Sequence, residues 1–262
     1  MSKLVVEQVS RIFPGVAGGE PTRALEPTDL LVGDADFVTI LGPSGCGKST
    51  LLRIVGGLET PTTGRVLLDG RPVTGPGAER GMVFQSYTLF PWLTVADNIA
   101  FGLVEKGMPA NERRSIVEEW IGQVGLKGFA HHYPKMLSGG MQQRTAIARA
   151  LANEPKILLL DEPFGALDNQ TRALMQELLL SVWEIHKKTV LFVTHDIEEA
   201  IFMGNRVAVM TARPGRIKSV TPVDLPHPRH YTMKTSPEFS ALKAHLVEEI
   251  RAESIKVAEQ VA

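Results

Sequence analysis

The chain has 262 residues, which suffice for one large α/β domain or two small ones with a buried core. Hydrophobic residues make up 44% and charged residues 22%, a composition that excludes a wholly disordered chain, a collagen-like repeat and a disulfide scaffold. Because 28 basic residues stand against 29 acidic ones and only 6% are aromatic, neither a global positive field nor an extensive base-stacking surface favours nucleic acid as a partner.

The single cysteine and the distribution of apolar residues indicate where the protein works. Cys46 cannot form an internal disulfide, which is compatible with a reducing compartment. The N-terminal residues reach an acid at Glu7 before the apolar stretch of a signal peptide can form, and no apolar run approaches the roughly 18 residues that span a bilayer. We therefore expect a cytoplasmic α/β protein, for which any membrane part would come from another chain.

Short apolar runs alternate with helical patterns along the chain, which predicts an α/β fold with a parallel or mostly parallel sheet. Near the N-terminus, glycines at 18–19 and over 64–77 predict turns between short antiparallel strands. Continuous apolar runs, typical of strands covered on both faces, occur at 37–41, 157–160, 190–193 and 207–210. Between the second and third of these, five apolar residues have the spacing of an amphipathic helix: Leu174, Leu178, Leu179, Val182 and Ile185.

The middle of the chain, from about residue 88 to 153, lacks strong strand runs. Apolar residues over 116–124 repeat at helical spacing there, which predicts a helical insert between the core strands. A proline-containing stretch at 222–237 predicts an irregular connection to a last helix. We expect one domain over residues 1–230, with the insert inside it, and a short helical tail over 231–262.

The strongest motif follows the first of the predicted core strands. Residues 42–49, the P-loop, match the pattern G-x-x-x-x-G-K-[ST], in which glycines let backbone N–H groups curl around phosphates at a helix N-terminus. Lys48 would reach the β- and γ-phosphates, and the Ser49 hydroxyl would ligate Mg²⁺. The candidate nucleotide-binding residues here are Gly42, Pro43, Ser44, Gly45, Cys46, Gly47, Lys48, Ser49 and Thr50.

The alternative to a phosphate-binding loop is a glycine-rich turn with an exposed lysine. In a chain of this composition, such a match arises by chance on the order of once per hundred chains. The strand pattern before the motif and the helical pattern after it lower that frequency further, so phosphate binding is favoured.

Two acids end the apolar run at 157–160. In open α/β folds, ligands bind beyond the carboxyl ends of the strands, which is where these acids fall. Asp161 suits a contact to Mg²⁺ through water, and Glu162 could accept a proton from the attacking water or orient it. Taken alone, an acidic turn that caps the next helix is the simpler interpretation. Beside a phosphate-binding loop, the catalytic interpretation is favoured.

A second helix start in the chain exposes backbone amides. Ser138 is a candidate N-cap, and Gly139 and Gly140 follow it at the beginning of a helical run. Either these residues form a second phosphate-facing site, or they simply cap a helix.

Six motifs in this order resemble those of the ATP-binding subunits of ABC transporters, and the resemblance covers nearly the whole chain. The P-loop resembles the Walker A motif, residues 137–142 the ABC signature, and residues 157–162 the Walker B motif with its catalytic glutamate. Gln85 resembles the Q-loop glutamine, residues 166–168 the D-loop, and His195 the switch histidine. The resemblance implies a P-loop NTPase fold, namely an ABC nucleotide-binding domain with a small antiparallel β-subdomain and a helical insert.

The resemblance also implies ligands and an assembly. ATP and Mg²⁺ would bind in a head-to-tail homodimer, with each ATP between the P-loop of one copy and Ser138, Gly139 and Gly140 of the other. Asp168 would act across the dimer interface, although an acid at a helix start is also an ordinary N-cap.

Roles for individual side chains follow from the same resemblance. The implied catalytic residues are Glu162, His195, Lys48 and Gln85, and the implied metal ligands are Ser49, Gln85 and Asp161. Taken alone, His195 could be a polar cap and Gln85 a solvated loop residue. Phe13 resembles the aromatic residue that stacks on adenine, or else it packs within the β-subdomain. Since a helix N-terminus and Lys48 flank Cys46 and lower a thiol pKa, we also expect thiol reagents to inhibit the ATPase and bound ATP to protect it.

Three functions remain to be compared: the ATPase subunit of a membrane importer, an ABC-type ATPase without transport, and a nucleotide-binding regulator that does not hydrolyse ATP. Repair-type relatives contain a long coiled coil and ribosome-associated ones two cassettes, and the sequence has neither. The regulator should lack the catalytic base, whereas Glu162 and His195 are present. Exporters usually fuse the membrane domain, so a separate importer subunit is favoured.

The segments 75–85, 89–95 and 213–217 resemble the nitrate, sulfonate and taurine importer group. This implies separate transmembrane permease subunits, a periplasmic or extracellular solute-binding protein, and a place on the cytoplasmic face of the cell membrane. The permease would dock between Gln85 and Ser138, with contacts from Phe90, Pro91 and Trp92, unless Trp92 anchors the core of the insert. The implied solute is a small anion, with another organic nutrient as the alternative.

Overall fold

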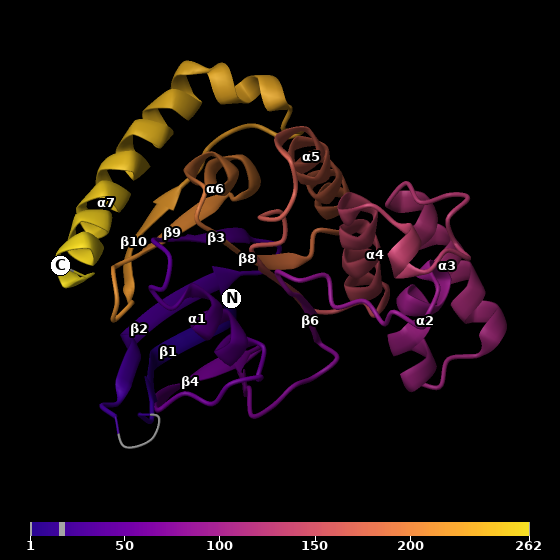
Figure 1. Cartoon of the computed structure of the whole chain (residues 1–262), viewed down its shortest axis with the longest axis horizontal. Coiled ribbons are helices and arrows are strands. Elements are labelled where there is room, and N and C mark those ends of the chain that lie inside the picture. Colours follow the sequence, from indigo (N-terminus) through magenta and orange to yellow (C-terminus); the bar gives the residue numbers. More distant parts are fainter. Residues whose placement is uncertain (1, 16–18, 262) are drawn as a thin grey trace. The chain divides into compact units, whose positions relative to one another are not determined.

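The computed structural model describes residues 2–15 and 19–261 of the chain (Figure 1). The chain divides into two compact units. The first unit comprises Met1–Gly77 and Lys187–Ala262, and the second comprises Ala78–His186. Over the described residues, none of the helices is both long and apolar enough to cross a bilayer.

An antiparallel sheet forms the N-terminal part of the first unit. Its four strands lie in the order β2-β1-β4-β5, and their bounds are β1 Ser2–Phe13, β2 Thr22–Gly33, β4 Thr63–Leu68 and β5 Arg71–Pro72. Along β1, buried Leu4, Val6 and Val9 alternate with more exposed residues, as in a sheet with one covered face. The predicted small β-subdomain is confirmed.

The core of the first unit is a mainly parallel set of strands. β3 (Phe37–Leu41) pairs in parallel with β8 (Thr189–Thr194) on one side and with β9 (Arg206–Met210) on the other. Every residue of β3 and β8 is buried, which explains their continuous apolar sequences. An edge strand that was not predicted, β10 (Ile217–Pro222), runs antiparallel to β9.

Helices and a C-terminal tail complete the first unit. They are α1 Lys48–Val55, α6 Ile197–Met203, the 3-10 helix Tyr231–Thr235 and α7 Pro237–Val261. In Figure 1, α7 runs past α6 toward β10. The connection between β10 and the 3-10 helix also holds the end of α6, because Nη1 of the buried Arg229 donates hydrogen bonds to the carbonyl oxygens of Ile201 and Phe202 at 2.9 Å and of Gly204 at 2.7 Å. These carbonyls have no partner within the helix ladder, so Arg229 acts as its C-terminal cap.

The second unit combines two strands with the predicted helical insert. β6 (Arg80–Val83) pairs in parallel with β7 (Ile157–Asp161), whose residues are all buried. The helices are α2 Val95–Glu105, α3 Ala110–Gln123, the 3-10 helix Pro134–Met136, α4 Gly139–Ala152 and α5 Asn169–His186. The insert therefore lies where the helical spacing predicted it, between the two strands in sequence.

In the second unit, one prediction about buried side chains is wrong, and one of two open alternatives for Trp92 is excluded. In α5, Leu174 and Ile185 are 58% and 70% exposed, whereas Met175, Leu179 and Trp183 are buried. The buried stripe thus runs through i, i+4 and i+8 one position away from the predicted start, and a shift of one residue rotates a helix face by about 100°. Trp92 does not anchor a core, since it is 70% exposed.

Candidate functional site

The P-loop runs from the end of β3 into the first turn of α1. Gly45 and Gly47 have φ angles of +76° and +103°, in the left-handed region that favours glycine. A Cβ atom on Gly47 would lie 2.7 Å from Cδ2 of Leu25 and 2.9 Å from the carbonyl oxygen of Ala24. Only glycine therefore lets the loop pack this closely against β2, and the predicted strand–loop–helix order is present.

Lys48 is buried, and its side chain folds back along the loop. Its Nζ donates hydrogen bonds to the carbonyl oxygens of Gly42 at 2.9 Å and of Pro43 at 3.1 Å. At the tip of the loop, Ser44 and Gly45 are exposed, while Ser49 and Thr50 are half-buried. An anion that enters the loop from solvent meets the N-terminal end of α1 and the ammonium charge together.

Cys46 is less accessible than the sequence suggested. Its side chain is buried at 1% exposure, and a Cβ atom on Gly42 would lie 2.9 Å from its Sγ. The thiol therefore points into the packed interior behind the loop, and a reagent reaches it only when the loop opens. The expected inhibition by thiol reagents stays a prediction that requires such a motion.

His195 lies at the same strand edge as the P-loop. Leu41 at the end of β3 is the register partner of Thr194 at the end of β8, so Gly42 and His195 continue from adjacent strand ends. His195 is exposed, and the turn that carries it is fixed on both sides. The hydroxyl of Thr194 accepts a hydrogen bond from the N–H of Asp196 at 3.0 Å, and Asp196 caps α6 by accepting from the N–H of Glu199 at 3.0 Å.

The second unit has a comparable edge, at the carboxyl ends of β6 and β7. Val83 is the register partner of Leu160, so Gln85 and Glu162 both lie two residues beyond paired positions. Asp161 is buried at 5% exposure, Glu162 is half-buried and Gln85 is exposed. Glu162 adopts a φ of +44°, and its carbonyl accepts the N–H of Gly165 at 3.2 Å, which turns the chain sharply after β7.

Ser138 and Asp168 each begin a helix of the second unit. The Ser138 hydroxyl accepts a hydrogen bond from the N–H of Met141 at 3.3 Å and is the N-cap of α4, so the predicted cap is confirmed. Asp168 accepts from the N–H of Thr171 at 3.0 Å and of Gln170 at 3.1 Å. A side-chain hydrogen bond with Thr171, and then these backbone bonds, lower the pKa of Asp168. Both residues are exposed at the starts of their helices.

Close packing around the first turn of α4 leaves no room for a side chain at two positions. A Cβ atom on Gly139 would lie 2.8 Å from the hydroxyl oxygen of Tyr87, and one on Gly140 would lie 2.8 Å from Cγ2 of Thr171. The sequence pattern gave no signal for the contact with Tyr87.

In the first unit, the guanidinium of Arg11 lies 4.5 Å from the ring centre of Phe13, so a cation already covers one face of this aromatic residue.

The residues expected to bind Mg²⁺ all offer oxygen donors. Within the described residues, no group of three or more His, Cys, Asp and Glu side chains could hold a metal ion. Ser49, Gln85 and Asp161 would supply a hydroxyl, an amide and a carboxylate oxygen. Mg²⁺ prefers such hard oxygen donors and usually keeps waters and substrate phosphates as its other ligands. The donor atom of each residue, taken by itself, therefore suits Mg²⁺ that binds together with a nucleotide.

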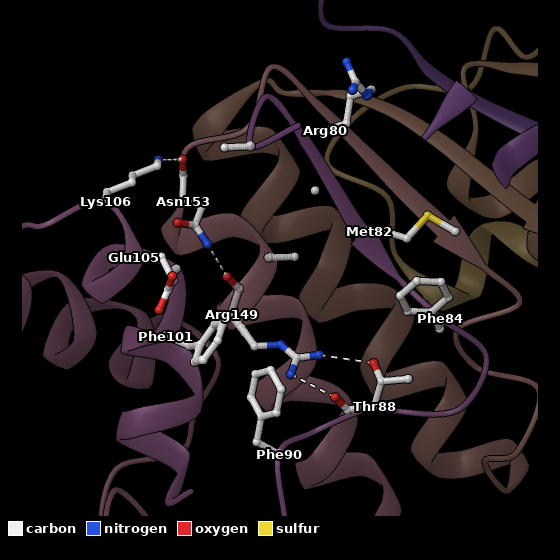
Figure 2. Close-up of a pocket in the computed structure, with 14 residues that line it drawn as sticks. Arg80, Met82, Phe84, Thr88, Phe90, Phe101, Glu105, Lys106, Arg149 and Asn153 are labelled. Carbon is white, nitrogen blue, oxygen red and sulfur yellow. Dashed lines mark hydrogen bonds between the residues drawn. The ribbon is translucent and has the colours of Figure 1, made fainter. Parts of the chain in front are cut away.

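A groove of about 610 Å³ in the second unit was not predicted as a site. Figure 2 shows the aromatic rings of Phe84, Phe90 and Phe101 around it, with the side chain of Arg149 between them. The guanidinium of Arg149 donates to the carbonyl oxygen of Thr88 at 2.9 Å and to its hydroxyl at 3.2 Å (Figure 2). Burial lowers the pKa of Arg149. The groove thus offers apolar rings around one partly buried cation.

The chain is similar to known proteins over most of its length. The family model described as "ABC transporter" matches residues 25–165. An uncharacterized ABC transporter ATP-binding protein of Methanocaldococcus jannaschii is 53% identical over 97% of this chain and 93% of its own length. The aliphatic sulfonates import ATP-binding protein SsuB of Bacillus licheniformis is 49% identical over 88% of this chain and 89% of its own length. The nitrate import ATP-binding protein NrtD of Synechocystis is 44% identical over 99% of both chains.

A solved structure gives the same result for the fold. The dimeric post-hydrolysis state of an ATP-binding cassette, bound to ADP and Pi, has a TM-score of 0.74 and 36% sequence identity, and it matches 85% of this chain and 100% of its own. The P-loop, the helix starts and the strand edges described above therefore belong to a known kind of ATPase. The chain is a member of the ABC transporter family and one of its ATP-binding proteins.

Proposed function

We propose that this chain is the ATP-hydrolysing, energy-coupling subunit of an importer for a small anion such as a sulfonate, taurine or nitrate. The observation that carries the proposal is the 44–49% identity, over 88–99% of the chain, to proteins named as sulfonate and nitrate import ATP-binding proteins. The domain division at residues 1–230 and 231–262 is part of the proposal.

Residues of the first unit would bind the nucleotide. The backbone N–H groups of the P-loop and Lys48 would hold the phosphates, because the side chain of Lys48 folds back along a glycine-containing loop that leads into the N-terminal end of α1. Phe13 would stack on the adenine with the ring face that Arg11 does not cover. Ser49, together with Asp161 and Gln85, would hold Mg²⁺, which supplies charge neutralisation at the β- and γ-phosphates when it is bound.

Side chains at the two strand edges would then support hydrolysis. Glu162 would accept a proton from the attacking water at its carboxylate oxygen, and Gln85 would help to orient this water. His195 would donate a hydrogen bond to the γ-phosphate from the exposed end of β8. Water attacks the γ-phosphorus as the bond to the ADP oxygen breaks, so that ADP and phosphate are the products.

A second copy of the chain would complete each site. Ser138, Gly139 and Gly140 form a helix start with an exposed cap, which suits the γ-phosphate bound by a partner. Asp168 would act across the same interface. The dimeric structure of the similar cassette supports this arrangement.

Transmembrane permease subunits would dock on the groove around Arg149, on the cytoplasmic face of the membrane. Three features support this surface as the docking site. Trp92 is exposed, its ring centre lies 5.6 Å from the ring centre of Phe90, and apolar rings line the groove (Figure 2). Pro91, which lies between these two aromatic residues, would contact the same partner. A solute-binding protein outside the membrane would select the solute without touching this chain.

Growth and uptake in a strain that lacks this chain test the proposal. We would supply single sources of sulfur (sulfate, taurine or alkanesulfonates) or of nitrogen (nitrate or ammonium). We expect a defect on one of the sulfonates or on nitrate, rescued by the wild-type chain but not by Lys48→Ala. Growth without a defect on any of these sources would overturn the choice of a small anion, and another organic nutrient would then be tested.

A further inference from the structure

The turn that joins β9 to β10, residues 211–216, packs directly on the P-loop. A Cβ atom on Gly215 would lie 1.8 Å from the carbonyl oxygen of Cys46 and 2.8 Å from Cε of Met210. The backbone of the turn therefore touches the backbone of the phosphate-binding loop, with no room for a side chain between them. Any displacement of Gly215 toward the loop must move Cys46.

Strand β2 holds both sides of this contact. The N–H of Gly215 donates to the carbonyl oxygen of Ala24 at 3.0 Å. In the P-loop, Gly47 packs on the same part of β2, against Ala24 and Leu25. The turn, the strand and the loop are thus in mutual contact, and the position of the turn determines the space in which the loop can lie.

The turn itself is closed by hydrogen bonds at its base. The N–H of Thr211 donates to the carbonyl oxygen of Arg216 at 2.9 Å, and the N–H of Arg216 donates to the hydroxyl of Thr211 at 3.0 Å. Because both ends are tied together, a group that holds one residue of the turn also holds Gly215.

The C-terminal helix α7 supplies that group. The N–H of Ala212 donates to Oε2 of Glu253 at 3.0 Å, while Nζ of Lys218 and of Lys256 lie 3.2 and 3.0 Å from Oε1. The side chain of Glu253 is only 1% exposed. Burial alone would raise the pKa of Glu253, but the hydrogen bonds from Ala212, Lys256 and Lys218 outweigh it and hold the pKa below its ordinary value. The carboxylate is therefore charged at neutral pH.

We propose that Gly215 and Glu253 are positioning residues for the nucleotide phosphates, through which helix α7 sets the affinity of the P-loop for ATP. The physical reason is that several N–H groups of one loop must point at the phosphates at once, and hydrogen bonds weaken steeply when they are misaligned. The inference rests on the proposed role of the P-loop as the phosphate site. It adds residues at the far end of the chain, which contact the loop and not the nucleotide.

Gly215→Ala tests the contact directly. Gly215 does not have a left-handed φ, so alanine fits its backbone, and the main clash that it creates is with the carbonyl group of Cys46, since the methyl end of the flexible Met210 side chain can move aside. The matched control is Gly75→Ala, since no atom lies within 4 Å of a Cβ there and its φ is also unstrained. In an equilibrium titration with a fluorescent ATP analogue, we expect Gly215→Ala to bind roughly tenfold more weakly or worse, and Gly75→Ala to bind like the wild type. Equal affinity of the two variants would overturn the proposal.

Glu253→Ala keeps the proposal testable if Gly215→Ala does not fold. The matched control is Glu249→Ala on the same helix, because Oε2 of Glu249 accepts a hydrogen bond from Ser219 of β10 at 2.6 Å and does not reach the turn. We expect Glu253→Ala to raise the KM for ATP roughly three- to tenfold with kcat nearly unchanged, and Glu249→Ala to leave both unchanged. Glu253→Gln retains an acceptor for the N–H of Ala212 and should restore much of the affinity.

A merely structural role for Glu253 predicts a different result. In that case the unfolding temperature of Glu253→Ala without nucleotide would be lower than that of the wild type, while its KM for ATP stayed at the wild-type value. That result would overturn the inference. Lys48→Ala separates this failure from a failure of the proposed site. If Lys48→Ala binds the analogue normally, the P-loop is not the phosphate site; if it loses binding while Gly215→Ala and Glu253→Ala bind normally, the site stands and the role of α7 fails.

Discussion

The strand edges of the two units follow one plan but present different chemical groups. In the first unit, β3 and β8 end at the P-loop and at His195, and most of the groups that we propose to face the nucleotide are backbone N–H groups. In the second unit, β6 and β7 end near Gln85 and Glu162, and the groups are side-chain oxygens. A backbone loop held by close packing at Gly47 moves only with its neighbours, whereas a side chain can turn alone. We infer that changes in the P-loop alter ATP affinity and that changes at Gln85 and Glu162 alter turnover.

Glu162→Gln gives the largest expected effect and sharpens this comparison. The amide has nearly the shape of the carboxylate but cannot accept a proton from water, so turnover should fall roughly 10²- to 10⁴-fold while ATP binding persists. Steady-state release of phosphate, together with an ATP titration of the same sample, measures both. Hydrolysis at the normal rate would contradict the assignment of Glu162 as the base.

His195→Ala tests the limit of this comparison, because His195 lies in the first unit, beside the P-loop, but is proposed to act in hydrolysis. It is exposed at the end of β8 and is proposed to donate to the γ-phosphate, so we expect turnover to fall roughly 10²-fold with ATP affinity almost unchanged. A variant that loses affinity as strongly as turnover would show that His195 belongs with the binding groups. The rate of hydrolysis at saturating ATP, measured beside an ATP titration, distinguishes a loss of turnover alone from a loss of both turnover and affinity.

Arg229→Ala tests whether the connection after β10 stabilises α6, the helix that follows His195. The substitution leaves three buried carbonyl oxygens of α6 and its C-terminal end without their donor, so the free energy of unfolding should fall by about 2 kcal/mol. Denaturant unfolding measures the change. The control is Lys243→Ala, which removes an exposed ion pair with Glu198 and should lower the free energy of unfolding much less. Equal losses in the two variants would contradict the capping role.

The smallest expected effect is a pH dependence from Glu253. Its pKa is lowered in the folded chain, so its contribution to stability is present above its ordinary pKa of 4.5 and is lost as the pH falls through the folded value. The thermal stability of the wild type should therefore exceed that of Glu253→Gln at pH 7, and the difference should shrink as the pH is lowered toward 4. A difference that does not depend on pH would show that the charge of Glu253 contributes nothing.

Patterns that depend on neighbours in sequence predicted much of the fold. The apolar runs became β3, β7, β8 and β9, because strands buried on both faces need apolar residues throughout. β10 was missed, since its residues alternate between half-buried and exposed positions and include polar Lys218 and Ser219. The face of α5 was predicted one position out, because Leu174 is as apolar as the buried Met175 beside it.

The candidate site also combines features that a local sequence pattern predicts with contacts that no local pattern reveals. The P-loop could be predicted because its spacing in sequence dictates its chemistry, and Ser138 could be predicted as a cap because Ser is a preferred N-cap residue and a helical run follows it. The contact of Gly215 with Cys46 could not, since it joins segments about 170 residues apart and has no local pattern. The burial of the carboxylate of Glu253 was equally hidden, because a glutamate in an amphipathic helix normally faces solvent.

One side-by-side measurement tests the central claim that the P-loop of the first unit binds ATP and that Glu162 of the second unit drives its hydrolysis. Bound ATP and released phosphate would be measured in the same samples of wild type, Lys48→Ala and Glu162→Gln. The account predicts that Lys48→Ala loses both signals, while Glu162→Gln keeps bound ATP and releases almost no phosphate. If Glu162→Gln instead loses bound ATP, or Lys48→Ala retains it, binding and hydrolysis are not divided between the two strand edges and the account is wrong.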